Sequence, residues 1–346
     1  MPVLDRMEHA APQRVLAVRF SSAGDIVLCS ALLRCIHGTW PNAKVDMLVR
    51  SDMAGLVSHN PNLNAIHTLD RASGLRGLMQ MARGLRARRY DLVIDLHNNF
   101  RSRLLGLMLQ PRFKTILGKR TIERWLAVHT RFRRGRPSKL LLERYFEPLE
   151  DYGIVYDGHG SEVHVSQDRK KRIELMLAPF ADRPILGIAP GASYPKKAFP
   201  LERFAHIAKQ IIEQTSAAVV LFGGPNDPKL EIDAPGRILD LQGTADMQEA
   251  AFAASRCRVV LTNDSLMLHL AEAAGTDALA FFGPTTQDFG YFPWRPTSKV
   301  IEVDLACRPC SKHGQGRCKE KDQYCFAQIE TSRVVDELKA RLGGAA

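Results

Sequence analysis

The stretch FSSAGD at residues 20–25 decides the fold when it is set beside TNDSLMLH at residues 262–269. Each stretch follows an apolar, β-like run (15–20 and 259–261) and leads into an apolar, helix-like run. Small polar residues therefore lie where a strand ends and a helix begins, which is where the binding crevice of a doubly wound α/β sheet is located. The sequence predicts one such crevice in each half of the chain.

The second stretch has the chemistry of an anion site. Asp264 and Ser265 stand at the expected start of a helix, where unpaired backbone N–H groups and a partial positive charge favour a phosphate. His269 lies four residues beyond Ser265, on the same helix face, and would reach the same ligand. The alternative is that His269 is an ordinary half-buried histidine.

The first stretch carries a carboxylate, which would repel an anion. Asp25 has two interpretations: a cap that accepts backbone N–H groups at the helix start, or a base that faces the anion site. An anion site and a possible base on two lobes suggest group transfer.

The length of 346 residues exceeds one ordinary domain, and two lobes are expected. Short β-branched runs alternate with helical stretches, which is typical of parallel sheets. A glycine-rich break at 157–161 precedes a probable helix at 166–177. We therefore expect domains at 1–165 and 166–346. The expected strands are 15–20, 45–49, 65–69, 92–96, 185–189, 218–222, 238–241, 259–262 and 278–282.

Positive charge is concentrated in the first half of the chain. The formal net charge is +11, and residues 71–144 hold 19 Lys and Arg against four Asp and Glu. This imbalance predicts an anionic partner, either nucleic acid, an acidic membrane surface or a phosphorylated substrate. The alternative is a solvated helix face with arginines lying over apolar neighbours. Because no nucleic-acid-binding signature accompanies the arginines, no nucleic-acid partner is expected.

Two further loops of small residues follow expected strands. GASYPKK occupies 191–197 after the strand at 185–189, and GPTT occupies 283–286 after the strand at 278–282. Ligands bind at the carboxyl ends of parallel strands, so both loops belong to the candidate site.

Five motifs in this order resemble the bacterial heptosyltransferases, which use ADP-heptose to build the lipopolysaccharide inner core. They are RFSSAGD at 19–25, PGA at 190–192 with KAFP at 197–200, FGGPND at 222–227, NDS at 263–265 with His269, and FGPT at 282–285. The resemblance implies the GT-B fold, in which two Rossmann-like doubly wound domains face a central cleft. The acceptor would bind the N-terminal domain and the nucleotide-sugar the C-terminal domain.

The resemblance also implies roles for individual residues. Asp25 would be the general base of an inverting transfer. The expected donor-binding residues are Ser193, Lys197, Asn226, Asp227, Asp264, Ser265, His269 and Thr285. Two departures bear on the donor: Leu266 stands where glycine is usual and would push a side chain toward the ligand, and Phe199 stands where tryptophan is usual.

The arginine-rich lobe is expected to bind an anionic glycolipid acceptor. The basic residues nearest the strand end at 95–99 are Arg101, Arg103, Lys119 and Arg120. A helix N-terminus and Lys197 can stabilise a leaving nucleoside diphosphate, so no cofactor is required for catalysis. The N-terminus lacks a secretory-signal pattern and no run is long enough to span a membrane, so we expect a cytoplasmic protein peripheral to the inner membrane.

Four cysteines cluster as Cys307, Cys310, Cys318 and Cys325. Their spacing is close to that of structural zinc sites, although the middle interval is short, and His313 could replace one ligand. Reduced thiols or disulfides and an iron–sulfur cluster are the alternatives. The expected closing helix runs from about 331 to 341.

Two alternatives to a heptosyltransferase stay open from the sequence. One is a glycosyltransferase of the same fold with another nucleotide-sugar donor. The other is a non-catalytic polyanion-binding protein, which would bind many polymers in a salt-sensitive way and have no saturable nucleotide site.

Overall fold

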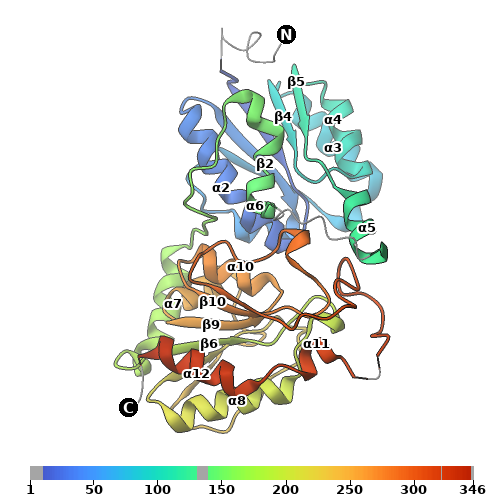
Figure 1. The fold of residues 1–346 in the computed structure, drawn as a ribbon. Coiled ribbons are helices and arrows are strands. Elements are labelled where there is room, and N and C mark those ends of the chain that lie inside the picture. The colour runs from blue at the N-terminus through green and yellow to red at the C-terminus, as the bar shows by residue number, and fades with distance from the viewer. Residues whose placement is uncertain (1–10, 131–138, 321, 344–346) are drawn as a thin grey trace. The chain divides into compact units, whose positions relative to one another are not determined.

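A computed structural model describes residues 11–130, 139–320 and 322–343 (Figure 1). The chain divides into two compact units. Unit 1 comprises Met1–Arg120 and Leu141–His164, and unit 2 comprises Thr121–Leu140 and Val165–Ala346. None of the described helices combines the length and the apolar character that a membrane crossing requires.

Unit 1 is built on a parallel sheet of five strands in the order β3-β2-β1-β4-β5. Its order reverses between β1 and β4, because the chain proceeds from β1 toward one edge and later returns to build the other. The strands are β1 (Arg14–Val18), β2 (Lys44–Arg50), β3 (Ala65–Leu69), β4 (Leu92–Asp95) and β5 (Phe113–Ile116).

Helices α3 and α4 pack side by side in unit 1. Both bury apolar side chains in one cluster with β1 and β4. Helix α2 packs against α6 and η1. The helical segments are α2 (Ala23–Thr39), η1 (Ser51–Leu56), η2 (Arg71–Ser73), α3 (Gly74–Arg86), α4 (Phe100–Leu109), α6 (Leu141–Arg144) and η3 (Glu147–Tyr152).

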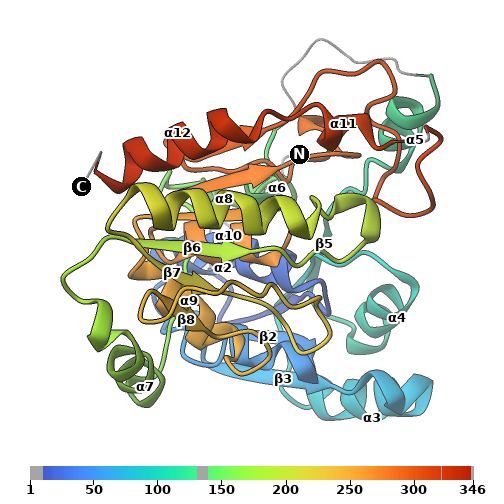
Figure 2. The ribbon, with the colours of Figure 1, turned by 90° about the horizontal axis from the view of Figure 1, so that it is seen from below.

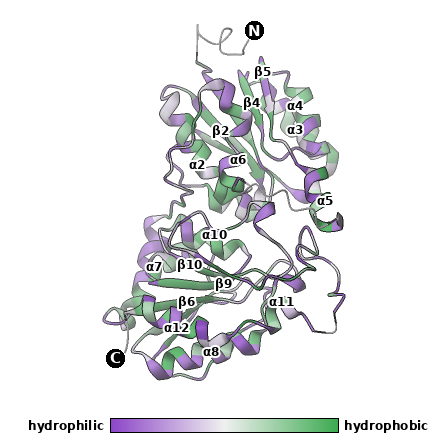
Figure 3. Cartoon of the chain, viewed as in Figure 1, coloured by the Kyte–Doolittle hydropathy of each residue, from purple (hydrophilic) through white to green (hydrophobic). Residues whose placement is uncertain are grey.

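Unit 2 is built on a parallel sheet of six strands in the order β11-β10-β9-β6-β7-β8. Its central strands are hydrophobic along their length, as expected of strands buried on both faces (Figure 3). The order reverses between β6 and β9. The strands are β6 (Ile185–Ala189), β7 (Ala218–Leu221), β8 (Ile238–Asp240), β9 (Val259–Asn263), β10 (Ala278–Phe281) and β11 (Lys299–Ile301).

One face of this sheet is covered by α8 and α12, which lie side by side (Figures 1 and 2). Helix α9 packs against both α7 and α10. The helical segments of unit 2 are α5 (Thr121–Thr130), α7 (Gln167–Leu177), η4 (Ala178–Phe180), η5 (Pro195–Lys197), α8 (Leu201–Gln214), α9 (Met247–Ser255), α10 (Leu266–Ala273), η6 (Gln287–Phe289), α11 (Tyr324–Ala327) and α12 (Thr331–Leu342).

The structure confirms the expected fold class, two doubly wound parallel α/β domains, and corrects one part of the domain division. The described residues of the segment 121–140, which the sequence places in the first domain, associate with unit 2. Helix α5 packs against η6 there, and Arg124 Nη2 lies 3.4 Å from the carbonyl oxygen of Phe289.

Candidate functional site

The donor side of the candidate site lies where the strand order of unit 2 reverses. The loop after β6 and the start of α10 after β9 come from neighbouring parallel strands, so they meet at one edge of the sheet. Asn263, the last residue of β9, joins them: its Oδ1 accepts from the N–H of Phe199 at 3.0 Å, and its Nδ2 donates to the carbonyl of Pro190 at 2.7 Å. Asn263 therefore holds the loop after β6 against the start of α10.

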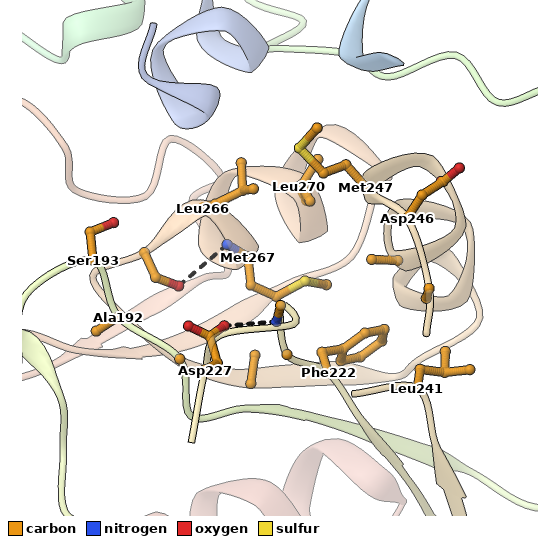
Figure 4. Close-up of a pocket in the computed structure, with 17 residues that line it drawn as sticks. Ala192, Ser193, Phe222, Asp227, Leu241, Asp246, Met247, Leu266, Met267 and Leu270 are labelled. Carbon is orange, nitrogen blue, oxygen red and sulfur yellow. Dashed lines mark hydrogen bonds between the residues drawn. The ribbon is translucent and has the colours of Figure 1, made fainter. Parts of the chain in front are cut away.

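A pocket of about 280 Å³ opens at this edge (Figure 4). This volume is close to the lower end of the range for small-molecule sites, roughly 300 to 1,000 Å³. Aliphatic, aromatic and thioether side chains form much of its wall, among them Phe222, Leu241 and Met247. Ser193, Asp227 and Ser265 are the expected donor-binding residues that line it. The pocket thus combines apolar walls suited to a flat base with a polar edge at the α10 N-terminus.

Ser265 caps α10, as the sequence predicts for a helix start. Its Oγ accepts from the N–H of Met267 at 3.3 Å. Leu266, at the first turn, lines the pocket together with Leu270 (Figure 4). Leu266 therefore contributes its side chain to the wall of this pocket.

Asp264 is the centre of a buried polar cluster beside the pocket. It is 5% exposed, and its Oδ2 lies 2.6 Å from Lys197 Nζ and accepts from Thr285 Oγ1 at 2.7 Å. These three residues come from three separate motifs, and the structure brings all three together. The ring centroids of His269 and Tyr291 are 6.2 Å apart, and Lys197 Nζ lies 6.0 Å from the Tyr291 centroid, so His269 lies near the same cluster.

Two of the expected donor-binding residues, Asn226 and Asp227, differ in placement. Asp227 closes its own turn, because Oδ2 accepts from the N–H of Gly224 at 2.8 Å. It also lies so close to Gly191 that a Cβ there would come within 2.4 Å of the carboxylate. Asn226 is exposed on the same turn and does not line the pocket.

Asp25 lies at the corresponding edge of unit 1, just after β1. It occupies the third position of α2, whose N-cap is Ser22. Its Oδ2 accepts from the N–H and the hydroxyl of Ser22 at 3.0 and 2.5 Å. Its Oδ1 lies 2.5 Å from Arg19 Nη2 and accepts from the Tyr145 hydroxyl at 3.2 Å. Asp25 is therefore a capping carboxylate and an ion-pair partner at once.

These contacts keep Asp25 ionised. Burial alone would raise the pKa of its carboxyl, but the charge of Arg19 and the hydrogen bonds from Ser22 outweigh burial and lower the pKa to about 2. The group is negatively charged at neutral pH and, while Arg19 holds it, weakly basic.

His97 follows β4, the strand that pairs with β1. Its ring meets the Phe20 ring edge-on, with centroids 5.2 Å apart. Burial, with the nearby charge of Arg19 adding to it, lowers the pKa of His97 to about 4. Its Nδ1 is buried and has no hydrogen-bond partner in the described part of the chain. The imidazole is neutral at pH 7.

The four basic residues expected at the acceptor side have different surroundings. Lys119 is exposed and lies near enough to His97 for its charge to act on that ring. Arg120 Nη2 donates to Glu147 Oε1 at 2.5 Å. Arg103 is exposed and donates from Nε to Asn98 Oδ1 at 2.8 Å, and Arg101 is half-buried on the same helix.

Cys307, Cys310, Cys318 and Cys325 are all free thiols. Among the residues that the structure describes, no three His, Cys, Asp or Glu side chains are arranged to hold a metal ion. Structural zinc at these cysteines stays a prediction, which elemental analysis of the purified protein would test.

Sequence reasoning missed several residues of these sites. Tyr145 and His97 lie near Asp25 but come from segments distant in the sequence, and no spacing rule links them. Arg19 stands in the same motif as Asp25, but its ion pair with Asp25 was not predicted. The apolar wall of Phe222, Leu241 and Met247 looks like ordinary core in the sequence. Asp246 does carry a signal: with Glu249 it forms a capping box at the start of α9, beside the pocket.

Comparisons with known proteins identify the family of this chain. Residues 78–320 match the model of glycosyltransferase family 9 (heptosyltransferase). The chain is 26% identical to lipopolysaccharide heptosyltransferase 2 of Escherichia coli K12, over 95% of this chain and 98% of that protein. It is also 26% identical to the lipopolysaccharide core heptosyltransferase OpsX of Haemophilus influenzae, over 79% of each.

Solved structures show the same fold. A family 9 glycosyltransferase from Veillonella parvula matches with a TM-score of 0.78 at 21% identity, over 95% of this chain and 97% of that one. The ADP-heptose lipopolysaccharide heptosyltransferase II of Escherichia coli matches with a TM-score of 0.74 at 24% identity, over 95% and 98%. Because the family model covers more than half of the sequence, the chain belongs to glycosyltransferase family 9, the heptosyltransferases.

Proposed function

We propose that this glycosyltransferase moves a heptose from ADP-heptose to an anionic sugar of the lipopolysaccharide core. The observation that carries the proposal is the pocket of unit 2, which runs from apolar walls to the α10 N-terminus beside the Lys197–Asp264 pair. Family membership and the names of the relatives support a heptose donor and a lipopolysaccharide acceptor.

In this reaction the acceptor hydroxyl oxygen attacks the anomeric carbon as the bond from that carbon to the diphosphate oxygen breaks, with inversion. The charge that develops on the leaving ADP would be stabilised by the N–H groups of α10 and by Lys197. Because Asp264 neutralises Lys197, the pair adds little net charge, and Asp264 instead orients the ammonium group.

The acceptor proton would pass to Asp25, which is ionised and therefore able to receive it. The Arg19 contact lowers the basicity of this carboxylate. An anionic acceptor that draws Arg19 away would raise that basicity at the moment it is needed. Arg19 thereby couples acceptor binding to base strength.

The acceptor is a glycolipid, and we place the enzyme at the cytoplasmic face of the inner membrane. The support is the excess of basic residues in 71–144. The competing idea of a non-catalytic polyanion-binding protein is set aside, because family 9 members are glycosyltransferases.

The donor is tested by thermal-shift measurements with ADP, GDP, UDP and CMP, of which ADP should give the largest shift. Lys197→Ala should weaken ADP binding about 10- to 100-fold, because it removes a charged donor and leaves the Asp264 carboxylate unneutralised beside the phosphates. Adenosine should bind the variant and the wild type alike. The exposed Lys209 supplies the control, and Lys209→Ala should bind ADP normally. A preference for UDP or GDP would exclude ADP-heptose as the donor.

The role of Asp25 needs a control with a similar structural cost. Asp46 is also a buried carboxylate of unit 1, but it lies within β2 rather than after a strand end. It accepts hydrogen bonds from Asn64 and Tyr90. Asp25→Asn should reduce turnover by at least about 10²-fold with ADP affinity intact. Asp46→Asn should reduce stability while turnover of the folded fraction is kept. Near-normal turnover of the Asp25→Asn protein would remove Asp25 from the mechanism.

A further inference from the structure

Four large apolar side chains are exposed on two adjacent helices of unit 1. Leu75 and Met79 on α3 are 51% and 40% exposed, and Phe100 and Leu107 on α4 are 72% and 70% exposed. Each of these helices also buries an apolar face in the core of unit 1, so the exposed side chains are additional to the packing that the fold requires. Contiguous exposed apolar side chains mark interaction surfaces.

The exposed side chains form stripes at helical spacing. Leu75, Met79, Arg83 and Arg86 follow one side of α3 at intervals of four, four and three residues. On α4, Phe100, Arg103 and Leu107 follow one side at intervals of three and four residues, and Gln110 is the C-cap residue of this helix. Residues at these intervals share a helix face.

The two stripes border each other. Arg86 stands at the end of the α3 stripe, and Gln110 caps the C-terminus of α4. Arg86 Nη2 donates to Gln110 Oε1 at 2.6 Å. Both helices follow parallel strands in the same direction and pack side by side (Figure 1). The Arg86–Gln110 contact joins their exposed sides, so these side chains form one surface. We call it the α3–α4 surface.

The charge of the α3–α4 surface is positive. Residues 71–112 contain nine arginines, no lysine, and two carboxylates, Asp91 and Asp95. Asp95 is buried, and Asp91 accepts from the backbone N–H groups of Gln13 and Arg14. Neither carboxylate belongs to α3 or α4, and the arginines within these two helices form no ion pair in the described part of the chain. Arg88, which follows α3, pairs with Asp46 of β2.

We propose that the α3–α4 surface docks on a membrane containing anionic phospholipid. Apolar side chains that insert at the acyl boundary, flanked by arginines that meet lipid phosphates, are the two features that interfacial binding requires. A nucleic acid would use the arginines but leave Leu75, Phe100 and Leu107 in water. The inference rests on the proposed function only in placing a glycolipid substrate in that membrane.

The test is sedimentation of the whole protein with phosphatidylcholine vesicles, with and without phosphatidylglycerol. Wild type should bind the anionic vesicles and bind pure phosphatidylcholine weakly. Arg76 and Arg83 are both exposed residues of α3. The Arg76→Gln/Arg83→Gln variant should lose about 25-fold in affinity, because each arginine near an anionic surface adds about 1 kcal/mol, which is about fivefold. Replacing Leu75, Phe100 and Leu107 by Ser should lower binding at least as much, with the charge unchanged.

Matched controls come from exposed residues elsewhere. Val155→Ser and Leu175→Ser replace side chains that are 74% and 77% exposed and should keep wild-type vesicle affinity. Unchanged vesicle binding of the triple Ser variant would overturn the proposal. So would competition by RNA that reduces the vesicle binding of this variant and of the wild type equally. The assay contains no donor or acceptor, so its failure leaves the proposed transfer untouched. Transfer to a deacylated, water-soluble acceptor should be equal for all of these variants and is the separate measure of the proposed function.

Discussion

His97 is kept uncharged by its surroundings beside Asp25. Burial and the charge of Arg19 oppose its protonation, and its pKa falls to about 4. A neutral imidazole next to an ionised carboxylate leaves Arg19 as that carboxylate's counter-ion. Protonation of His97 would introduce a second positive charge against Arg19.

This shift makes stability depend on pH. Between pH 6.5 and 4 the unfolded chain protonates His97 and the folded chain does not, so the free energy of unfolding should decrease as the pH falls through this window. In the His97→Gln protein, the fall in the free energy of unfolding over this window should be smaller by roughly 1 to 3 kcal/mol. Urea unfolding at pH 7, 5.5 and 4.5 measures it. The exposed His59 provides the control, and a His59→Gln protein should keep the wild-type slope. An unchanged slope in His97→Gln would contradict the neutral-histidine interpretation.

At the donor side, individual residues could be predicted because their motifs follow strands. Lys197, Asp264 and Thr285 each follow a different strand of unit 2, and parallel strands bring such positions to one edge. Contacts around Asp25 could not be predicted in this way. Tyr145 is 120 residues away and reaches Asp25 from the short helix α6, whose position depends on tertiary packing.

At the scale of elements, the cysteine-rich segment supports the donor loops. The N–H of Cys310 donates to the carbonyl of Pro284 at 3.1 Å, and Gln323 Nε2 donates to the carbonyl of Lys196 at 2.6 Å. At Gly314, φ is +82°, and a Cβ there would lie 2.8 Å from Cγ of Lys197. Whatever the state of the thiols, this segment supports the loop that carries Lys197.

Arg308 makes the strongest of these contacts. The side chain is buried and donates to the carbonyls of Gly283 and Thr285, among others, and pairs with Glu302. Arg308→Met should lower stability by about 3 to 5 kcal/mol, because it leaves buried carbonyls without their donor. ADP affinity should also fall, since the loop that carries Thr285 loosens. Urea unfolding and ADP titration measure the two effects.

The control for Arg308 is a surface arginine. Arg333 is paired with Glu330 on α12 and its side chain is 80% exposed, so Arg333→Met should change stability by less than about 1 kcal/mol. Equal effects of the two substitutions would show that Arg308 does not support the loop.

The nine strands expected from the sequence all form, with ends that differ by one or two residues at most. The two that sequence reasoning missed, β5 and β11, each form one edge of their sheet, whereas the opposite edges, β3 and β8, were expected. Both are short and include a lysine, and their side chains are at most partly buried. An edge strand needs no continuous apolar run, so it lacks the signal that identifies central strands.

At the scale of the whole molecule, each unit has its own parallel sheet and its own core. All the residues that line the donor pocket belong to unit 2. Ligand binding stabilises the folded structure that contains its site. ADP bound in this pocket, as proposed above, should therefore stabilise unit 2.

Calorimetry should show this selectivity. Unfolding should occur in two transitions, and ADP at about 100 times its Kd should stabilise one of them by about 2.7 kcal/mol while the other stays in place. In the Lys197→Ala protein the same ADP concentration should give a smaller shift. Equal displacement of both transitions by ADP would contradict independent unfolding of the units.

Because residues 121–140 belong with unit 2, the chain crosses between the units after Arg120, after Leu140 and after His164. A cut after His164 alone would therefore not divide the protein into its two units. The N-terminal fragment would keep α5, and the C-terminal fragment would retain η6 without the helix that packs on it. Fragments made in this way carry complementary surfaces, so a cut after His164 is suited to reassembly in trans. Separate expression of each unit would instead require residues 121–140 to be moved from the N-terminal to the C-terminal fragment.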